Sequence, residues 1–151
     1  MDISKILNPD HILLSQSPGS RAVLLNLLAR SAAEALGLSE ADIRQALEAR
    51  EALGTTGIGG GVAIPHATLD GLDAPFLMPV ILRKPVEMDA VDEAPVDLVF
   101  LSLFPTGDQI SPLKLMSAIT RRLNEEGVAE TLRKAKDAET AFFALTQPSE
   151  R

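Results

Sequence analysis

The sequence predicts an α/β fold in which helices cover a central sheet. Two segments, 76–84 and 96–104, are apolar and rich in branched residues, as is typical of strands buried on both faces. Segments with helical periodicity lie before and after them in the chain. The chain has 151 residues, a length that one hydrophobic core can support, and it shows no internal repeat or linker. We therefore expect a single domain over residues 1–151.

Composition and charge limit the classes of function. The 21 acidic and 14 basic side chains give a net charge of −7, which has the wrong sign for binding nucleic acid. The absence of Cys excludes disulfides and thiolate zinc sites and fits a reducing cytoplasm. The apolar runs are far shorter than the roughly 20 residues that cross a bilayer. We expect a cytoplasmic protein without an export signal or membrane insertion.

Two helices are predicted at 21–37 and 39–53. Apolar residues recur at spacings of three and four in the first, and Gly37 ends it. Ser39 is a favourable N-cap for the second, because its hydroxyl can accept a free backbone amide. Arg50 lies three and seven residues after the apolar positions Leu47 and Ile43 of this helix and therefore shares its inward face. Its guanidinium either reaches back to water or serves a buried site.

A glycine-rich segment, GTTGIGGG at 54–61, follows the second helix. Five glycines in eight positions predict a loop rather than regular structure. Pro65 has no amide hydrogen, so the following VAIPHA segment is expected to be an edge strand or the end of a strand. His66 comes directly after this proline.

The second half of the chain continues the pattern. Residues 85–95 form either a long connection or a short strand around 85–88. Ser111 and Pro112 are predicted to open a third helix that closes near Gly127. Two short helices follow, at 128–135 and 137–145, and residues 147–151 are expected to be an irregular tail.

His66 is the candidate catalytic residue. The glycine segment lacks the Lys and Ser or Thr that follow the last Gly of a nucleotide P-loop, and its spacing breaks the dinucleotide fingerprint. Neutral imidazole is a nucleophile, and phosphoryl transfer needs an in-line approach and donors to the phosphate oxygens. The candidate donors are Arg50, Thr55, Thr56 and the amides of loop residues such as Gly57 and Gly59.

A purely structural histidine is the alternative interpretation, and we assign His11 to that class. His11 lies in the segment DHILL, with no glycine loop or cation near it in the sequence. No metal site is expected, because the two histidines are far apart and no Cys is present.

The run REALGTTGIGGGVAIPHA, residues 50–67, resembles the active-site signature of the fructose, mannitol and nitrogen-related enzyme IIA family (type 2) of the bacterial phosphotransferase system. ISKILNPDHILL, PVDLVFLSLFP and LKLMSAITRRL extend the resemblance over nearly the whole chain. The resemblance implies a mixed sheet of about five strands flanked by helices, as in mannitol IIA. It also implies that His66 accepts a phosphoryl group, on Nε2, from an HPr-like phosphocarrier, that Arg50 faces the phosphate, and that no cofactor is needed.

One position departs from the family pattern. Many members carry a second histidine at the start of the helix that aligns with PLKLM, and Pro112 stands there in this sequence. Proline offers no donor or acceptor in its place. Three functions remain open: a nitrogen-related phosphocarrier whose state regulates target proteins, a sugar-route IIA that passes the group to a IIB cysteine, and a binding module that no longer transfers phosphate.

Overall fold

An antiparallel pair of long strands forms the centre of the protein in the computed structural model, which describes residues 1–147. The pairs β1–β5, β3–β6 and β4–β6 are parallel, whereas β2 pairs antiparallel with β3, so the sheet is mixed. The strand order is β1-β5-β6-β3-β2, with β4 also on β6. The six strands are β1 (Leu13–Gln16), β2 (Gly57–Gly59), β3 (Val62–Ala63), β4 (His66–Leu69), β5 (Phe76–Val86) and β6 (Val96–Pro105). This confirms the predicted α/β class, with six strands against the expectation of about five.

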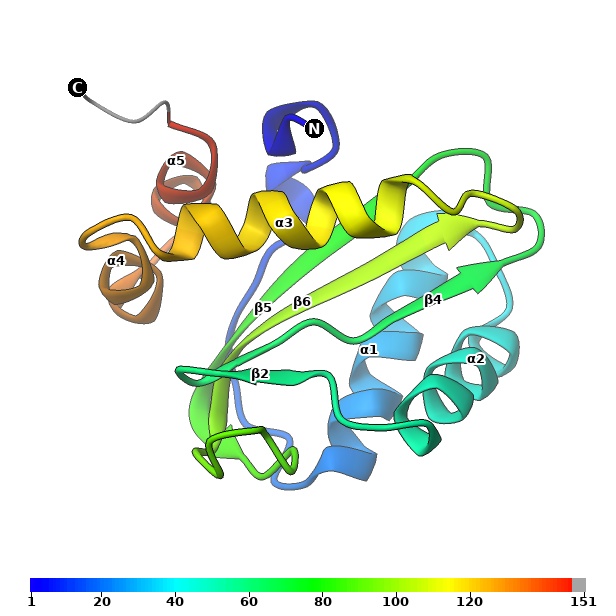
Figure 1. Cartoon of the computed structure of the whole chain (residues 1–151), viewed down its shortest axis with the longest axis horizontal. Helices are drawn as coiled ribbons and strands as arrows, with labels where there is room; N and C mark the ends of the chain where they lie inside the picture. Colours follow the sequence, from blue (N-terminus) through cyan, green and yellow to red (C-terminus); the bar gives the residue numbers. More distant parts are fainter. Residues whose placement is uncertain (148–151) are drawn as a thin grey trace.

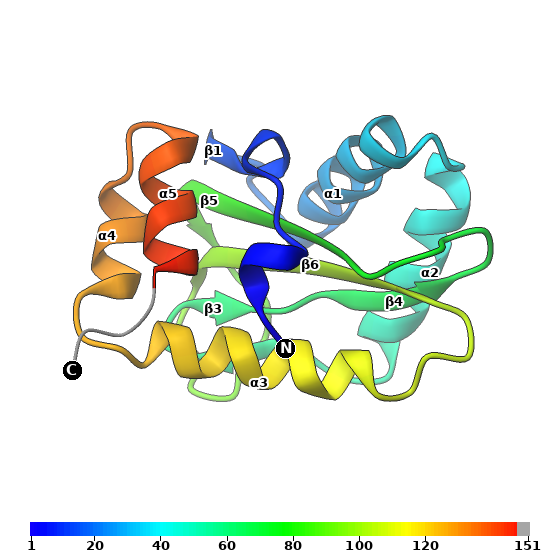
Figure 2. The same ribbon diagram turned by 90° about the horizontal axis from the view of Figure 1, so that it is seen from above.

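Helices cover both faces of this sheet (Figures 1 and 2). The pair α1 and α2 packs on one face, and α3, α4 and α5 pack on the other with two short 3-10 turns. The elements are η1 (Ile3–Lys5), η2 (Pro9–His11), α1 (Arg21–Leu36), α2 (Glu40–Ala52), α3 (Ser111–Leu123), α4 (Val128–Lys134) and α5 (Ala138–Thr146). Within residues 1–147, none of these helices is both long and apolar enough to cross a membrane.

The alternation of side chains along β6 divides the interior into two cores. Val99 and Leu101 belong to the core beneath α1 and α2, whereas Leu98, Phe100 and Phe104 belong to the core beneath α3 to α5. All five are at most 2% exposed, which explains why the sequence of this strand is almost continuously apolar. Burying a side chain of this size contributes about 1.5–3 kcal/mol to stability.

Local signals set the ends of α1 and α2 as predicted. The hydroxyl of Ser20 accepts the amide of Val23, and that of Ser39 accepts the amide of Asp42. Gly37 ends α1 in the left-handed conformation, with φ of 68°. The last turn of α2 therefore ends directly before the glycine-rich segment.

The glycine-rich segment is not the irregular loop that the sequence predicts. It folds into a small hairpin in which β2 pairs with β3 across a turn at Gly60 and Gly61, both at positive φ. Distant residues stabilise this hairpin: Asp92 accepts the amide of Gly60 at 2.9 Å, and Arg133 donates to its carbonyl at 2.6 Å. The segment between β5 and β6 is a long connection rather than a separate strand, because residues 85 and 86 extend β5.

Candidate functional site

His66 lies at the first position of an edge strand. Val62 pairs with Leu98 and His66 pairs with Ser102, so β3 and β4 follow the same register along β6. The strand is interrupted only around Pro65, which lacks an amide hydrogen, although its carbonyl still accepts the amide of Ser102 at 2.9 Å. Of the two expectations for VAIPHA, an edge strand or the end of a strand, the first holds from His66 onward, because among the described strands β4 pairs with β6 alone. The ring of His66 is half-buried, so part of it remains open to solvent.

Both ring nitrogens of His66 have protein partners. Nδ1 lies 2.8 Å from the carbonyl oxygen of Ile64, and the Nε of Arg50 donates to Nε2 at 3.3 Å. A carbonyl oxygen only accepts and a guanidinium only donates, so a single neutral tautomer satisfies both contacts. In that tautomer Nδ1 carries the proton and Nε2 carries the lone pair. The lone pair of the ring in that tautomer therefore lies on the side of Arg50.

Arg50 reaches the ring from the last turn of α2. Ile43 and Leu47 on the same face are fully buried, and α2 packs against β4. The Nη1 of Arg50 donates to the carbonyl of Gly54 at 3.0 Å, which fixes the plane of the guanidinium. The structure thus brings together the two residues that the sequence singled out, and the guanidinium of Arg50 is directed to the ring of His66.

The two threonines of the glycine segment form hydrogen bonds with neighbouring segments and not with the ring of His66. The Thr55 hydroxyl donates to the carbonyl of Met88 at 2.6 Å and accepts the amide of Gly57 at 3.0 Å. Thr56 is buried, and its hydroxyl donates to the carboxylate of Glu51. A Cβ on Gly57 would lie 2.9 Å from the Cβ of Ala90, so the segments touch and only glycine fits there.

Gly59 lies further along the hairpin. A Cβ on Gly59 would lie 3.4 Å from the carboxylate of Asp92 and 3.7 Å from Val91, so its nearest neighbours belong to the connection between β5 and β6. Its φ of 100° requires glycine.

The start of α3 holds Ser111 and Pro112. In the turn before this helix, Asp108 accepts the amides of Ile110, the N-cap residue, and of Ser111 at 3.2 and 2.9 Å. Hydrogen bonds from the side chain and amide of Ser111 lower the pKa of Asp108 below its usual value. Within the described residues 1–147, no hydrogen bond joins Ser111 or Pro112 to His66.

The other histidine has a structural contact. The ring of His11 packs in a tilted arrangement against Phe76, with centroids 5.1 Å apart. Across residues 1–147, no group of three or more His, Asp or Glu side chains is placed to hold a metal ion.

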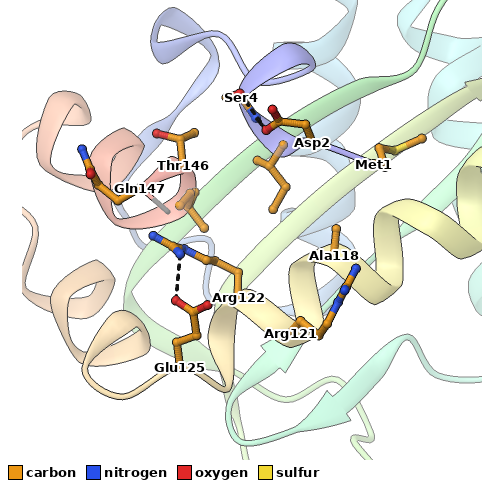
Figure 3. Close-up of a pocket in the computed structure, with 11 residues that line it drawn as sticks. Met1, Asp2, Ser4, Ala118, Arg121, Arg122, Glu125, Thr146 and Gln147 are labelled. Atoms are coloured by element: carbon orange, nitrogen blue, oxygen red, sulfur yellow. Dashed lines mark hydrogen bonds and ion pairs between the residues drawn. The ribbon is translucent and has the colours of Figure 1, made fainter. Parts of the chain in front are cut away.

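Sequence reasoning did not anticipate a cavity of about 530 Å³ between η1, α3 and α5 (Figure 3). Arg121 and Arg122 line it, but the guanidinium of Arg122 donates to Glu125 at 2.7 Å and to the carbonyl of Ala144 at 2.8 Å. None of the described residues that line this cavity belongs to the site around His66.

The fold and site define an open α/β protein that places one imidazole beside a guanidinium at a sheet edge. The family model described as "Phosphoenolpyruvate-dependent sugar phosphotransferase system, EIIA 2" matches residues 5–147. The chain belongs to this family of phosphotransfer components, which confirms the resemblance drawn from residues 50–67.

Individual relatives agree with this assignment. A nitrogen regulatory protein of Bradyrhizobium diazoefficiens is 38% identical over 148 residues, which cover 98% of this chain and 97% of that protein. The crystal structure of nitrogen regulatory protein IIA-Ntr from Neisseria meningitidis superposes with a TM-score of 0.89 at 34% identity, covering 95% of this chain and 99% of that one. The crystal structure of IIA mannitol from Escherichia coli shares the fold, with a TM-score of 0.79 at 18% identity over 92% of this chain and 98% of that one.

Proposed function

We propose that this protein is a cytoplasmic, single-domain phosphocarrier that accepts a phosphoryl group on Nε2 of His66 from an HPr-like phosphohistidine protein. The observation that carries the proposal is the pair of contacts at His66: Nδ1 lies 2.8 Å from the carbonyl oxygen of Ile64, and Nε2 lies 3.3 Å from the Nε of Arg50. A half-buried ring with Nδ1 anchored and with the lone pair of Nε2 held by one long contact to Arg50 suits nucleophilic catalysis.

In the transfer step, the lone pair of Nε2 attacks the phosphorus of the donor. An N–P bond forms on His66 as the N–P bond of the donor phosphohistidine breaks, and its electron pair returns to the donor ring. The proton on Nδ1 stays in its hydrogen bond with Ile64 during the attack, so the ring that forms carries a proton on Nδ1 and phosphorus on Nε2. This ring is an imidazolium, whose positive charge is balanced by the attached phosphoryl group.

Arg50 changes partner during this step. Its Nε–H contact with Nε2, at 3.3 Å, is long and must be released for the attack. The guanidinium then turns its donors to the oxygens of the transferring group while Nη1 stays on Gly54. Thr55, Thr56, Gly57 and Gly59 shape the pocket by holding the hairpin beside it.

Phosphorylation would give the protein two states that a target can distinguish. The phosphoryl group brings about two negative charges to the surface at the edge of β4, one of which is offset by the imidazolium ring that carries it. We propose that this change regulates the binding of target proteins, as the names of the nitrogen regulatory relatives suggest. The net charge of −7 favours a donor and targets with basic or mixed-charge surfaces.

A sugar-route function is the second candidate, because the family is described as a sugar phosphotransferase system. In that case the phosphoryl group passes from His66 to the cysteine of a separate IIB protein. Incubation of the phosphorylated protein with purified IIB proteins separates the two, since a regulator retains its phosphate in their presence.

A binding module without transfer is the third candidate, and Pro112 in place of the second histidine motivates it. The test is incubation with phosphoenolpyruvate, enzyme I and an HPr-like carrier, followed by intact-mass spectrometry under conditions that preserve phosphohistidine. The phosphocarrier function predicts one added, acid-labile phosphoryl group, absent from a His66→Ala variant and present in a His11→Ala variant. An unmodified wild-type protein would favour the module.

A further inference from the structure

Glu51 is a nearly buried carboxylate that the transfer step does not use. Its side chain is 6% exposed, and it directly follows Arg50 in the last turn of α2. One carboxylate oxygen accepts the Nη2 of Arg21 at 3.1 Å, and the other accepts the hydroxyl of Thr56. A carboxylate in such a position is stable because it is paired and hydrogen-bonded, and here both oxygens have partners. Glu51 therefore links the start of α1, the end of α2 and the glycine hairpin.

Arg21 extends the link to a fourth segment, the connection between β5 and β6. Its Nη1 pairs with Asp89 at 3.2 Å and its Nη2 approaches the carbonyl of Met88 at 3.4 Å. The same carbonyl of Met88 accepts the hydroxyl of Thr55 at 2.6 Å. Arg21 and Thr55 thus share the carbonyl of Met88, and Glu51 binds Thr56 directly. The two threonines lie directly before the first strand of the hairpin.

The hairpin in turn holds the ring of His66. The carbonyl of Thr56 accepts the amide of Ile64 at 3.0 Å, and the carbonyl of Ile64 accepts Nδ1–H of His66 at 2.8 Å. The path from Glu51 to Nδ1 therefore passes through two backbone residues. Nε2 is held from the same turn of α2, because Arg50 is the neighbour of Glu51 in the sequence.

We propose that the Arg21–Glu51 pair positions His66 for phosphoryl transfer by holding Thr56 and, through it, the carbonyl of Ile64 that keeps the proton on Nδ1. The inference rests on the proposed transfer to Nε2 and assigns two positioning residues to it. With the pair removed, the hairpin shifts, Ile64 no longer selects one tautomer, and a fraction of the rings carries the proton on Nε2, where it blocks attack. A displacement of about 1 Å in such a site lowers the rate by up to 100-fold.

The test compares E51M and E51Q with the wild-type protein. Methionine has a similar length but no charge and only a weakly accepting sulfur, so E51M is expected to show mixed tautomers of His66 by ¹⁵N NMR of the unphosphorylated protein. Its rate at saturating phosphorylated carrier is expected to fall roughly 10- to 100-fold, with an unchanged half-saturating concentration. E51Q keeps one acceptor oxygen for Thr56 and is expected to retain more of the rate than E51M does.

Glu125 provides the matched control, because Arg122 pairs with it at 2.7 Å and is only 12% exposed, but this pair lies at the end of α3. E125M is expected to keep the tautomer and the transfer rate of the wild type, whatever its thermal stability. A folded E51M with the wild-type tautomer and rate overturns the inference. A change in the half-saturating concentration alone, with the wild-type rate at saturation, overturns it as well. If E51M does not fold, E51Q is judged by the same criteria. A wild-type protein that accepts no phosphate refutes the proposed function, whereas the NMR comparison still decides the positioning role.

Discussion

Replacement of Arg50 by lysine tests the role of its guanidinium in phosphoryl transfer. In the structure Arg50 contacts both Nε2 of His66, at 3.3 Å, and the carbonyl of Gly54, at 3.0 Å. Lysine keeps the positive charge but has no planar fork, so it cannot hold Gly54 and direct a second donor to the phosphate. Loss of one charge-assisted hydrogen bond in the transition state raises the barrier by about 1.5–3 kcal/mol. Since 1.36 kcal/mol corresponds to a factor of ten, R50K should transfer roughly 10- to 150-fold more slowly.

The assay is rapid-quench transfer from a purified phosphorylated HPr-like carrier at saturating concentration. Arg44 lies on the same helix, six residues earlier, and R44K is the matched control that should transfer at the wild-type rate. Thermal unfolding of both variants separates a rate effect from a loss of folded protein. A wild-type transfer rate in R50K would refute the reasoning, because it would mean that Arg50 only covers apolar surface with its stem.

Three further predictions concern α3 and the hairpin. Pro112→His should lengthen the lifetime of the phosphorylated state by restoring an imidazole donor at the start of α3, and an unchanged rate of phosphate hydrolysis would contradict the argument from the missing histidine. Gly57→Ala should destabilise the protein by about 1–3 kcal/mol in denaturant unfolding, because its Cβ would lie 2.9 Å from that of Ala90; an unchanged midpoint would mean that the hairpin yields freely. The pKa of Asp108 is lowered by its hydrogen bonds with Ser111, so its contribution to stability is present above its ordinary pKa of 3.8 and is lost as pH falls through the lower folded value. The difference in unfolding free energy between wild type and D108N should therefore shrink in acid. A difference that persists in strong acid would count against a stabilising role for these hydrogen bonds of the charged carboxylate.

Elements with local signals were predictable from the sequence. The ends of α1 and α2 follow from Ser39 and Gly37, whose hydrogen bonds and backbone angle involve only neighbours in the chain. The strands β5 and β6 follow from their apolar character, because burial on both faces makes most of their positions apolar. Arg50 and His66 could be identified as candidate site residues because one short run of sequence contains both.

Elements that depend on distant residues were not predictable. Strand β1 has four residues, and its place in the sheet depends on β5, far away in the chain. The sequence predicts a loop at 57–63 instead of a hairpin, because the residues that stabilise the hairpin are distant in the chain. Asp92 and Arg133 lie 32 and 73 residues from Gly60. Arg21 lies 30 residues before Glu51, so nothing in the sequence distinguished this carboxylate from an ordinary solvated one at a helix end.

The site of phosphorylation is the measurement that tests the account most directly. Two-dimensional ¹⁵N NMR of histidine-labelled protein, recorded after phosphorylation by the carrier, distinguishes the two rings and the two nitrogens of each. The structure predicts phosphorus on Nε2 of His66, with the proton retained on Nδ1 and the signals of His11 unchanged. Phosphorus on Nδ1 of His66, or on the ring of His11, would contradict the account.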